Sequence, residues 1–162
     1  MKMETVKHNF KFTNKLTPRK TTKEIILHCS ATPEGKDYTV SQIHQWHLAR
    51  KFSGIGYNYV IYRDGTIHEG RPVEMSGAHC TNHNSISVGI CYIGGMDKDN
   101  KKAKDTRTQA QKEAQYKLVK MLLDKYKLKL TDVHGHYEFA AKSCPCFKKQ
   151  DFYKEYNEFF ES

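Results

Sequence analysis

The stretch Glu24-Ile25-Ile26-Leu27-His28-Cys29-Ser30 is a short apolar run between polar neighbours. A run of this length and composition predicts a buried strand at the centre of a sheet. His28 falls at the end of this strand, and the ends of strands in α/β sheets are where binding residues collect. Because successive side chains of a strand point to opposite faces, we expect Cys29 to lie in the core, on the face opposite His28.

The chain after this strand shows clear starts of helices and one clear hairpin. Two capping boxes, Thr39-Val-Ser-Gln42 and Thr108-Gln-Ala-Gln111, predict the first residues of two helices. The first helix should run to about Phe52, and composition favours a core position for its Trp46. The pair Asp64-Gly65 predicts the turn of a hairpin. The hairpin strands are expected at residues 56–62 and 66–69, and further strands at residues 87–93 and 128–133.

The predicted order is strand, helix, hairpin, strand, helix, strand, helix. An aromatic stripe at residues 152–160 predicts that the last helix packs on the domain. This order indicates an α/β fold: one domain with a central mixed β-sheet flanked by helices. The length of 162 residues suits a single core. We expect this domain at residues 23–162, after a basic, weakly patterned arm at residues 1–22 that is extended or flexible.

Charge and composition limit the possible partners. The net charge of +9 suits a polyanion, such as nucleic acid, an anionic membrane or the polymers of a bacterial cell wall. No nucleic-acid motif is present and the lysines are dispersed, so we expect no nucleic-acid partner. No run approaches the roughly 20 apolar residues of a membrane span. No signal peptide is recognisable either, so we expect synthesis in a cytoplasm. There an odd count of five cysteines argues against a disulfide framework.

The stretch His134-Gly-His136-Tyr-Glu-Phe-Ala-Ala-Lys142-Ser-Cys144-Pro145 gathers possible metal ligands. Neutral imidazole nitrogen and thiolate sulfur are ligands that zinc prefers, although an isolated His-Gly-His is more often a solvated pair. The strand ending at Val133 can lie beside the strand ending at His28. His28, His136 and Cys144 would then converge. Three protein ligands with a fourth position open are typical of catalytic zinc, which lowers the pKa of bound water to about 7.

A lysine and a tyrosine would complete such a site. When a carbonyl is attacked, negative charge builds on its oxygen, and a positive charge or a hydrogen-bond donor nearby stabilises it. Lys142 lies two residues before Cys144 and can supply the charge. Tyr57 can supply a hydrogen bond, although the sequence alone favours reading it as an ordinary strand residue, one of ten tyrosines.

Several blocks in one order resemble the zinc-dependent N-acetylmuramoyl-L-alanine amidases of the type-2 amidase and peptidoglycan-recognition family. Within that family the chain is most similar to the short phage lysozyme-amidases of the T7 lysozyme kind. The resemblance covers roughly residues 24–147. Its blocks are Ile26–Thr32, Ile43–His47, Gly54–Gly65, Gly77–His79, Ser87–Cys91, Gly94–Gly95 and His136–Pro145.

The resemblance implies one zinc ion per chain, held by His28, His136 and Cys144. The family pattern is a Gly-His pair about eight residues before the cysteine, which selects His136 as the ligand and leaves His134 as a neighbour or an exposed residue. The residues matched to catalytic positions are Tyr57 and Lys142, and those matched to substrate contacts are His79 and Asn84. The implied reaction is hydrolysis of the amide between N-acetylmuramic acid and L-alanine of the stem peptide.

The chain departs from the family at Cys146, where relatives usually carry a small residue. This thiol could compete for metal or become oxidised, but its spacing from Cys144 favours a packed or free thiol. The other reading of the function is a non-catalytic peptidoglycan-binding recognition module. Members that only bind lack the cysteine ligand, which is present here as Cys144.

The resemblance also implies where the protein acts. We expect a monomer whose partner is peptidoglycan, without stable membrane insertion. A phage or prophage endolysin, made in the cytoplasm and acting on the cell wall after release, fits these expectations best. An enzyme that recycles muropeptides is the alternative.

Overall fold

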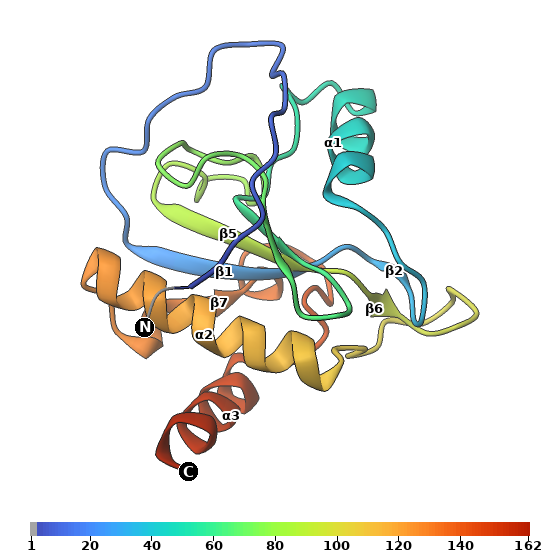
Figure 1. The fold of residues 1–162 in the computed structure, drawn as a ribbon, viewed down its shortest axis with the longest axis vertical. Helices are drawn as coiled ribbons and strands as arrows, with labels where there is room; N and C mark the ends of the chain where they lie inside the picture. The colour runs from blue at the N-terminus through green and yellow to red at the C-terminus, as the bar shows by residue number, and fades with distance from the viewer. Residues whose placement is uncertain (1–2) are drawn as a thin grey trace.

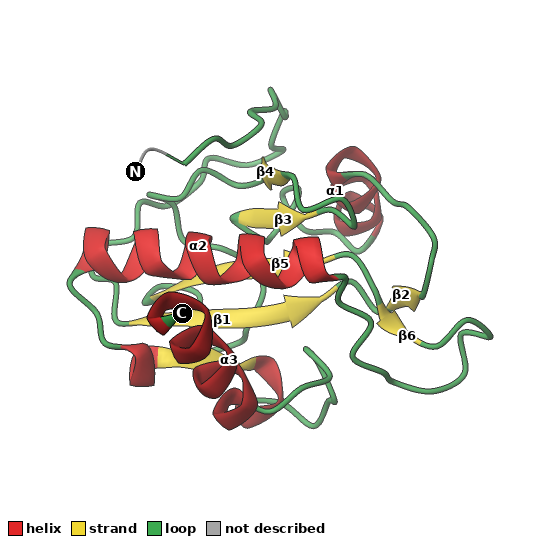
Figure 2. Cartoon of the chain, turned by 60° about the horizontal axis from the view of Figure 1, so that its bottom comes forward, coloured by secondary structure: helices red, strands yellow, loops and turns green. Residues whose placement is uncertain are grey.

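The structure is a computed structural model and describes residues 3–162. A mixed sheet with the strand order β4-β3-β5-β1-β7 forms its centre, and helices lie on both faces (Figures 1 and 2). The order of elements and the single α/β domain are as predicted, and a small sheet of β2 and β6 is added. The elements are β1 Glu24–Cys29, β2 Thr32–Pro33, α1 Val40–Ala49, β3 Tyr59–Ile61, β4 Ile67–Glu69, β5 Ser87–Tyr92, β6 Gly95–Met96, α2 Gln109–Tyr126, β7 Val133–Gly135 and α3 Lys149–Glu161.

Strand β1 lies between two parallel neighbours, as expected for a fully apolar strand. It pairs with β5 on one side and with β7 on the other. In the β1–β7 register Leu27 lies opposite Gly135, so the next residues of the two strands, His28 and His136, lie at the same edge of the sheet. The predicted adjacency of these two strand ends is confirmed.

The two faces of the sheet bury different residues. Figure 2 shows α2 and α3 lying across one face, which contains Ile25, Leu27 and Cys29 of β1. Helix α1 contributes Val40 and Ile43 to a smaller cluster on the other face. Cys29 is therefore in the core and on the face opposite His28, as the alternation of the strand predicts.

Both capping boxes are confirmed, and α1 ends earlier than expected. The side-chain oxygens of Thr39 and Thr108 accept the N–H groups of Gln42 and Gln111 at 3.1 and 3.0 Å. Helix α1 stops at Ala49 because the chain then turns through a left-handed conformation, with φ 69° two residues later.

The core position predicted for Trp46 is wrong, since 38 % of this residue is exposed. The buried stripe of α1 consists of Val40, Ile43, His44 and His47. Trp46 lies beside this stripe, where its ring packs edge-on against Tyr38, with 5.4 Å between the ring centroids.

The strand predicted at residues 128–133 is displaced toward the C-terminus. Residues Leu130–Asp132 form a 3₁₀ turn instead, and β7 follows it. The carboxylate of Asp132 accepts the N–H of Lys129 at 2.8 Å, which closes the turn and competes with an extended chain. His134 therefore lies inside β7, and His136 is the first residue after it.

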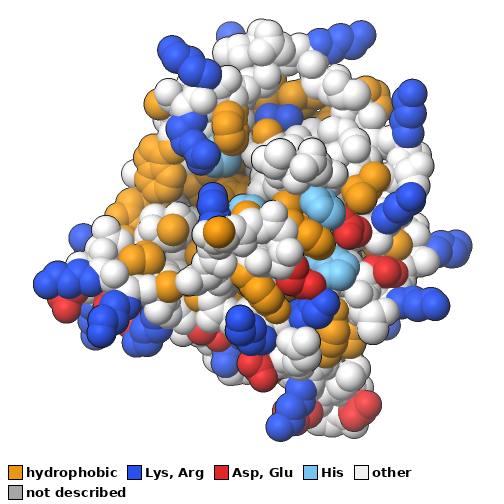
Figure 3. Space-filling model, turned by 180° about the vertical axis from the view of Figure 1, so that it is seen from behind, with side chains coloured by type: hydrophobic (Ala, Val, Ile, Leu, Met, Phe, Trp, Pro, Cys, Tyr) orange, Lys and Arg blue, Asp and Glu red, His pale blue; other side chains and the backbone are white. Residues whose placement is uncertain are grey.

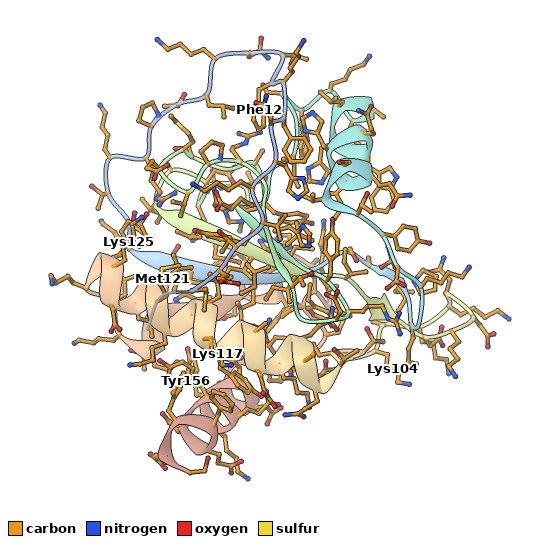
Figure 4. All side chains as sticks on the ribbon, viewed as in Figure 1. Phe12, Lys104, Lys117, Met121, Lys125 and Tyr156 are labelled. Carbon is orange, nitrogen blue, oxygen red and sulfur yellow. The ribbon has the colours of Figure 1, made fainter. Side chains whose placement is uncertain are left out.

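The aromatic stripe at the C-terminus packs on the domain as predicted. Phe152 of α3 is fully buried, and Tyr156 and Phe159 pack against the same core. Lys117, Met121 and Lys125, labelled in Figure 4, share one side of α2. None of the helices in residues 3–162 is both long and apolar enough to cross a membrane.

The N-terminal arm, described from residue 3, is an extended chain that follows the domain surface (Figure 1). Val6 exchanges two backbone hydrogen bonds with β4, to Ile67 and from Glu69, both 2.8 Å long. Farther along, Phe10 stacks on His44 of α1, and Phe12 packs edge-on against the same ring (Figure 4). Residue 23 as the start of the domain stays a prediction.

Candidate metal centre

Three possible metal ligands meet at the edge of the sheet where β1 and β7 end. One donor atom from each of His28, His136 and Cys144 lies within 4.8 Å of the other two. The Nδ1 atom of His28 is 3.8 Å from Sγ of Cys144, and the rings of His28 and His136 are 4.5 Å apart between centroids. The structure thus brings together the three residues that the sequence predicted as ligands, from segments more than 100 residues apart.

Both imidazoles of this group are suited to be neutral ligands. Burial, together with the neighbouring groups His79, His136 and Lys142, holds the pKa of His28 well below its ordinary value. Burial and the nearby Lys142 also lower the pKa of His136. A neutral imidazole keeps a lone pair free for a metal ion, so the histidines do not have to lose a proton near neutral pH to bind one.

The loop after β7 holds Cys144 in place through its backbone. The N–H of Tyr137 donates to the carbonyl of Cys144 at 2.8 Å, and Tyr92 of β5 donates its hydroxyl to the carbonyl of Pro145 at the same distance. The N–H of Cys29 points at Sγ of Cys144 at 3.2 Å. This contact holds the sulfur at the end of β1, beside His28.

His134 lies apart from the donor group. Its Nδ1 atom is 3.1 Å from the carboxylate of Glu138, and its Nε2 atom is 3.8 Å from that of Glu24. Lys149 also pairs with Glu138, at 2.6 Å. The ring of His134 therefore lies between two carboxylates, while His136 faces His28.

The two residues predicted for catalysis, Tyr57 and Lys142, lie near the donor group. The ring of Tyr57 lies 5.1 Å from that of His28 and comes just before β3, in a segment that was expected to be strand. Burial raises the pKa of Tyr57 well above its ordinary value, so its hydroxyl keeps its proton. Lys142 is exposed, and its charge contributes to the lowered pKa values of both histidines.

The structure does not expose His79 and Asn84 as a pair of substrate contacts. His79 is only 8 % exposed and lies behind His28, with Nδ1 of His79 at 2.8 Å from Nε2 of His28. The Oδ1 atom of Asn84 accepts the N–H groups of His79 and Cys80, at 2.8 and 2.9 Å. These contacts occupy groups that the sequence prediction assigned to substrate.

Cys146 is a packed free thiol and not part of the donor group. Its Sγ atom lies 3.8 Å from Sγ of Cys29 and donates to the carbonyl of Gly95 at 3.3 Å. The cysteines of the described chain form no disulfide bond. Cys29 faces the core, so Cys146 lies on the far side of the sheet edge from the two histidine donors.

Two histidines of α1 support the segment of Tyr57 and were not singled out from the sequence. Nδ1 of His44 accepts the N–H of Ile55, and Nδ1 of His47 accepts the N–H of Gly56, both at 2.9 Å. Burial, with Arg50 and Arg71 nearby, lowers the pKa of His47 to about 4. The sequence signal was their spacing on the buried stripe of the helix, where a histidine requires a polar partner.

The surface has several hollows. One of about 480 Å³ is lined by Lys142, Ser143 and Cys146, which flank Cys144 in the sequence. Another of about 600 Å³ lies along α2 and the start of the arm. Figure 3 views the face opposite to that of Figure 1, where histidines reach the surface near the middle and lysines and arginines lie mostly around the edge.

Comparisons with known proteins agree on one family. A family model described as N-acetylmuramoyl-L-alanine amidase matches residues 18–147, which include all three donor residues. The endolysin of Klebsiella phage KP32 is 38 % identical over 134 residues, or 81 % of this chain and 85 % of that protein. The endolysin of Escherichia phage T7 is 37 % identical over 129 residues, or 80 % and 83 %. The solved N-acetylmuramoyl-L-alanine amidase LysC from Clostridium intestinale URNW aligns with a TM-score of 0.82 and 26 % identity, over 96 % of this chain and 99 % of that one.

Proposed function

We propose that this chain, which belongs to the N-acetylmuramoyl-L-alanine amidase family, cleaves peptidoglycan with one zinc ion held by His28, His136 and Cys144. The bond cleaved is the amide between the lactyl group of N-acetylmuramic acid and L-alanine of the stem peptide. Water adds across this bond: the lactyl carbon gains the hydroxyl, and the alanine nitrogen takes a proton and leaves as an amine. The convergence of the three donors at one strand edge is the observation that carries the proposal.

The donor set suits zinc in its chemistry, and the pair of His28 and Cys144 also suits it in spacing. Zinc–nitrogen bonds of about 2.0–2.1 Å and a zinc–sulfur bond of about 2.3 Å, at tetrahedral angles, imply donor atoms about 3.4–3.6 Å apart. The separation of 3.8 Å between Nδ1 of His28 and Sγ of Cys144 is close to this range. Three donors instead of four are typical of a catalytic ion and not of a structural one.

The chain's own groups would bind and polarise the amide. When bound, zinc supplies Lewis-acid chemistry and lowers the pKa of water to about 7. Lys142, exposed beside the two histidines, stabilises the negative charge that develops on the carbonyl oxygen. Tyr57 stays protonated and offers its hydroxyl as a hydrogen-bond donor near His28.

The relatives support a role in cell-wall lysis, because the two relatives that match more than three quarters of the chain and are named above are phage endolysins. The net charge of +9 would favour encounter with the anionic polymers of a cell wall. We propose that the protein acts as a monomeric endolysin of a phage or prophage, and that it reaches the wall after release from the cell that makes it.

The test combines metal content with product analysis. The protein is purified without chelator, zinc is measured per chain, and purified peptidoglycan is digested and analysed by mass spectrometry. We expect about one zinc ion per chain, free stem peptides that begin with L-alanine, and intact glycan strands. Zinc without cleavage would favour a recognition module that only binds peptidoglycan. Absence of both zinc and cleavage would contradict the assignment of the centre.

A further inference from the structure

We propose that His79 is a positioning residue that fixes the ring of His28 so that its Nδ1 atom faces the metal. This inference rests on the proposed zinc centre and goes beyond it, because His79 contributes no ligand. The Nε2 atom of His28 lies 2.8 Å from Nδ1 of His79, in the interior of the protein. Nδ1 of His28 lies on the other side of the same ring, 3.8 Å from Sγ of Cys144.

The hydrogen bonds around His79 allow one consistent arrangement of protons. A neutral imidazole carries one N–H, so a His28 that offers Nδ1 to a metal carries its proton on Nε2. That proton is donated to Nδ1 of His79, which places the proton of His79 on Nε2. This second N–H lies 3.2 Å from Oγ of Ser87, which donates its own hydroxyl to the carbonyl of His83 at 2.6 Å. Each donor in the chain has an acceptor, and His79 has no ring nitrogen left for a substrate.

The ring of His79 occupies a space that two glycines leave open. A Cβ atom on Gly89 of β5 would lie 2.7 Å from its Cγ and Cδ2 atoms. A Cβ atom on Gly77 would lie 2.6 Å from Cδ2. Gly89 lies opposite Ile26 of β1, two residues before His28, so the missing side chain makes room for an imidazole directly behind His28.

The backbone of His79 is also held, so the ring approaches His28 from a defined direction. The side-chain oxygen of Asn84 accepts the N–H groups of His79 and Cys80. These two hydrogen bonds close the loop that leads from Gly77 to β5. The two rings meet edge to face, with an interplanar angle of 87°. In this geometry the in-plane lone pair of one ring receives the in-plane N–H of the other without steric contact between ring faces.

Groups that hydrogen-bond to metal-binding histidines fix their tautomer and orientation, and losing one typically weakens metal binding about 10–100-fold. In most proteins this partner is a carboxylate or a carbonyl. Here it is a neutral imidazole, which adds no charge to the centre but depends on its own partner, Ser87, to present the correct nitrogen. The ring of His79 is therefore a support for His28 and not a substrate contact.

The test measures zinc affinity by competition with a chromophoric chelator at constant pH. We expect His79→Ala to bind zinc about 10–100-fold more weakly than the unchanged protein. We expect His79→Asn to recover most of this loss, because the Oδ1 atom of asparagine lies near the position of Nδ1 and accepts the same proton. The control is His83→Ala in the same loop, whose side chain bonds Glu24 and no donor of the centre; it should bind zinc as tightly as the unchanged protein.

Equal affinity in His79→Ala and the unchanged protein would overturn the proposal, and so would His79→Asn binding as weakly as His79→Ala. If His79→Ala does not fold, a measurement on the unchanged protein tests the proposal instead. Nitrogen-15 NMR of labelled histidines should show a proton on Nε2 of His28 and a coupling across the hydrogen bond to Nδ1 of His79. A proton on Nδ1 of His28 would contradict the positioning role. An unchanged protein that shows this coupling but binds no zinc would overturn the proposed metal centre, and the hydrogen bond would stand.

Discussion

The Nδ1 atom of His28 lies 3.8 Å from Sγ of Cys144, although 116 residues separate the two in the chain. Two features of the sheet produce this contact. β1 and β7 are adjacent and parallel, so both end at the same edge. The loop after β7 then returns, and the hydrogen bond from Tyr137 to the carbonyl of Cys144 brings the sulfur back to the end of β1.

Replacement of a ligand should remove both metal and activity. We expect Cys144→Ser and His136→Ala each to lose zinc at stoichiometric concentrations and to hydrolyse peptidoglycan at background rate, because two remaining donors hold zinc poorly. Metal content after gel filtration and release of stem peptides measure the two effects. Normal activity in either variant would refute the assignment of the centre.

The matched control for these variants is His134→Ala. His134 belongs to the same short stretch as His136, but its ring pairs with Glu138 and Glu24. We expect this variant to keep about one zinc ion per chain, with a small loss of stability from the ion-pair network. Loss of metal would mean that the two histidines exchange roles in solution.

Lys142→Ala should separate chemistry from metal binding. The side chain is exposed and is not a donor, so zinc content should not change. Removing one group that stabilises charge in a transition state typically slows turnover about 10²–10³-fold. The exposed Lys125→Ala on α2 removes the same charge at a distance and is the control. Equal turnover of Lys142→Ala and the control would remove Lys142 from the mechanism.

Acid should destabilise the protein through His47. Its folded-state pKa of about 4 lies below the ordinary value of 6.5, so the unfolded chain binds more protons between these two values. The free energy of unfolding should therefore be insensitive to this group above pH 6.5. It should fall below pH 6.5 by up to about 1.4 kcal/mol per pH unit until pH 4.

His47→Asn tests this origin, because the asparagine oxygen can accept the N–H of Gly56 and does not titrate. Denaturant unfolding of both proteins, with zinc removed by chelator, should give a steeper pH dependence for the unchanged protein between pH 4 and 6.5. Parallel curves would show that His47 does not carry this effect.

Gly89→Ala should weaken zinc binding without touching a ligand. The added Cβ atom would lie 2.7 Å from the buried ring of His79, which must shift away from His28. Overpacking of this kind typically costs about 1–3 kcal/mol of stability. We expect zinc affinity, measured by chelator competition, to fall in the same direction as in His79→Ala. Unchanged zinc affinity would show that the space around the ring of His79 tolerates an added methyl group.

Much of the fold could be predicted from local patterns. The apolar run at residues 24–29, the two capping boxes and the Asp64-Gly65 turn each depend on residues close in sequence, and each was found where predicted. The errors came from local competition. The side chain of Asp132 closed a turn where a strand was expected, and the left-handed turn after α1 ended the helix early.

The sequence by itself determined the order of the elements, the strand that ends at His28, and the residue types able to bind a metal near the end of another strand. These features follow from burial periodicity and donor chemistry, which are readable along the chain. The resemblance already selected His136 over His134, and the tertiary structure adds that His136 faces His28 while His134 contacts Glu138. Only the tertiary structure decided that His79 lies behind His28. The orientation of a side chain depends on neighbours that the fold brings from distant segments, and no local pattern encodes those neighbours.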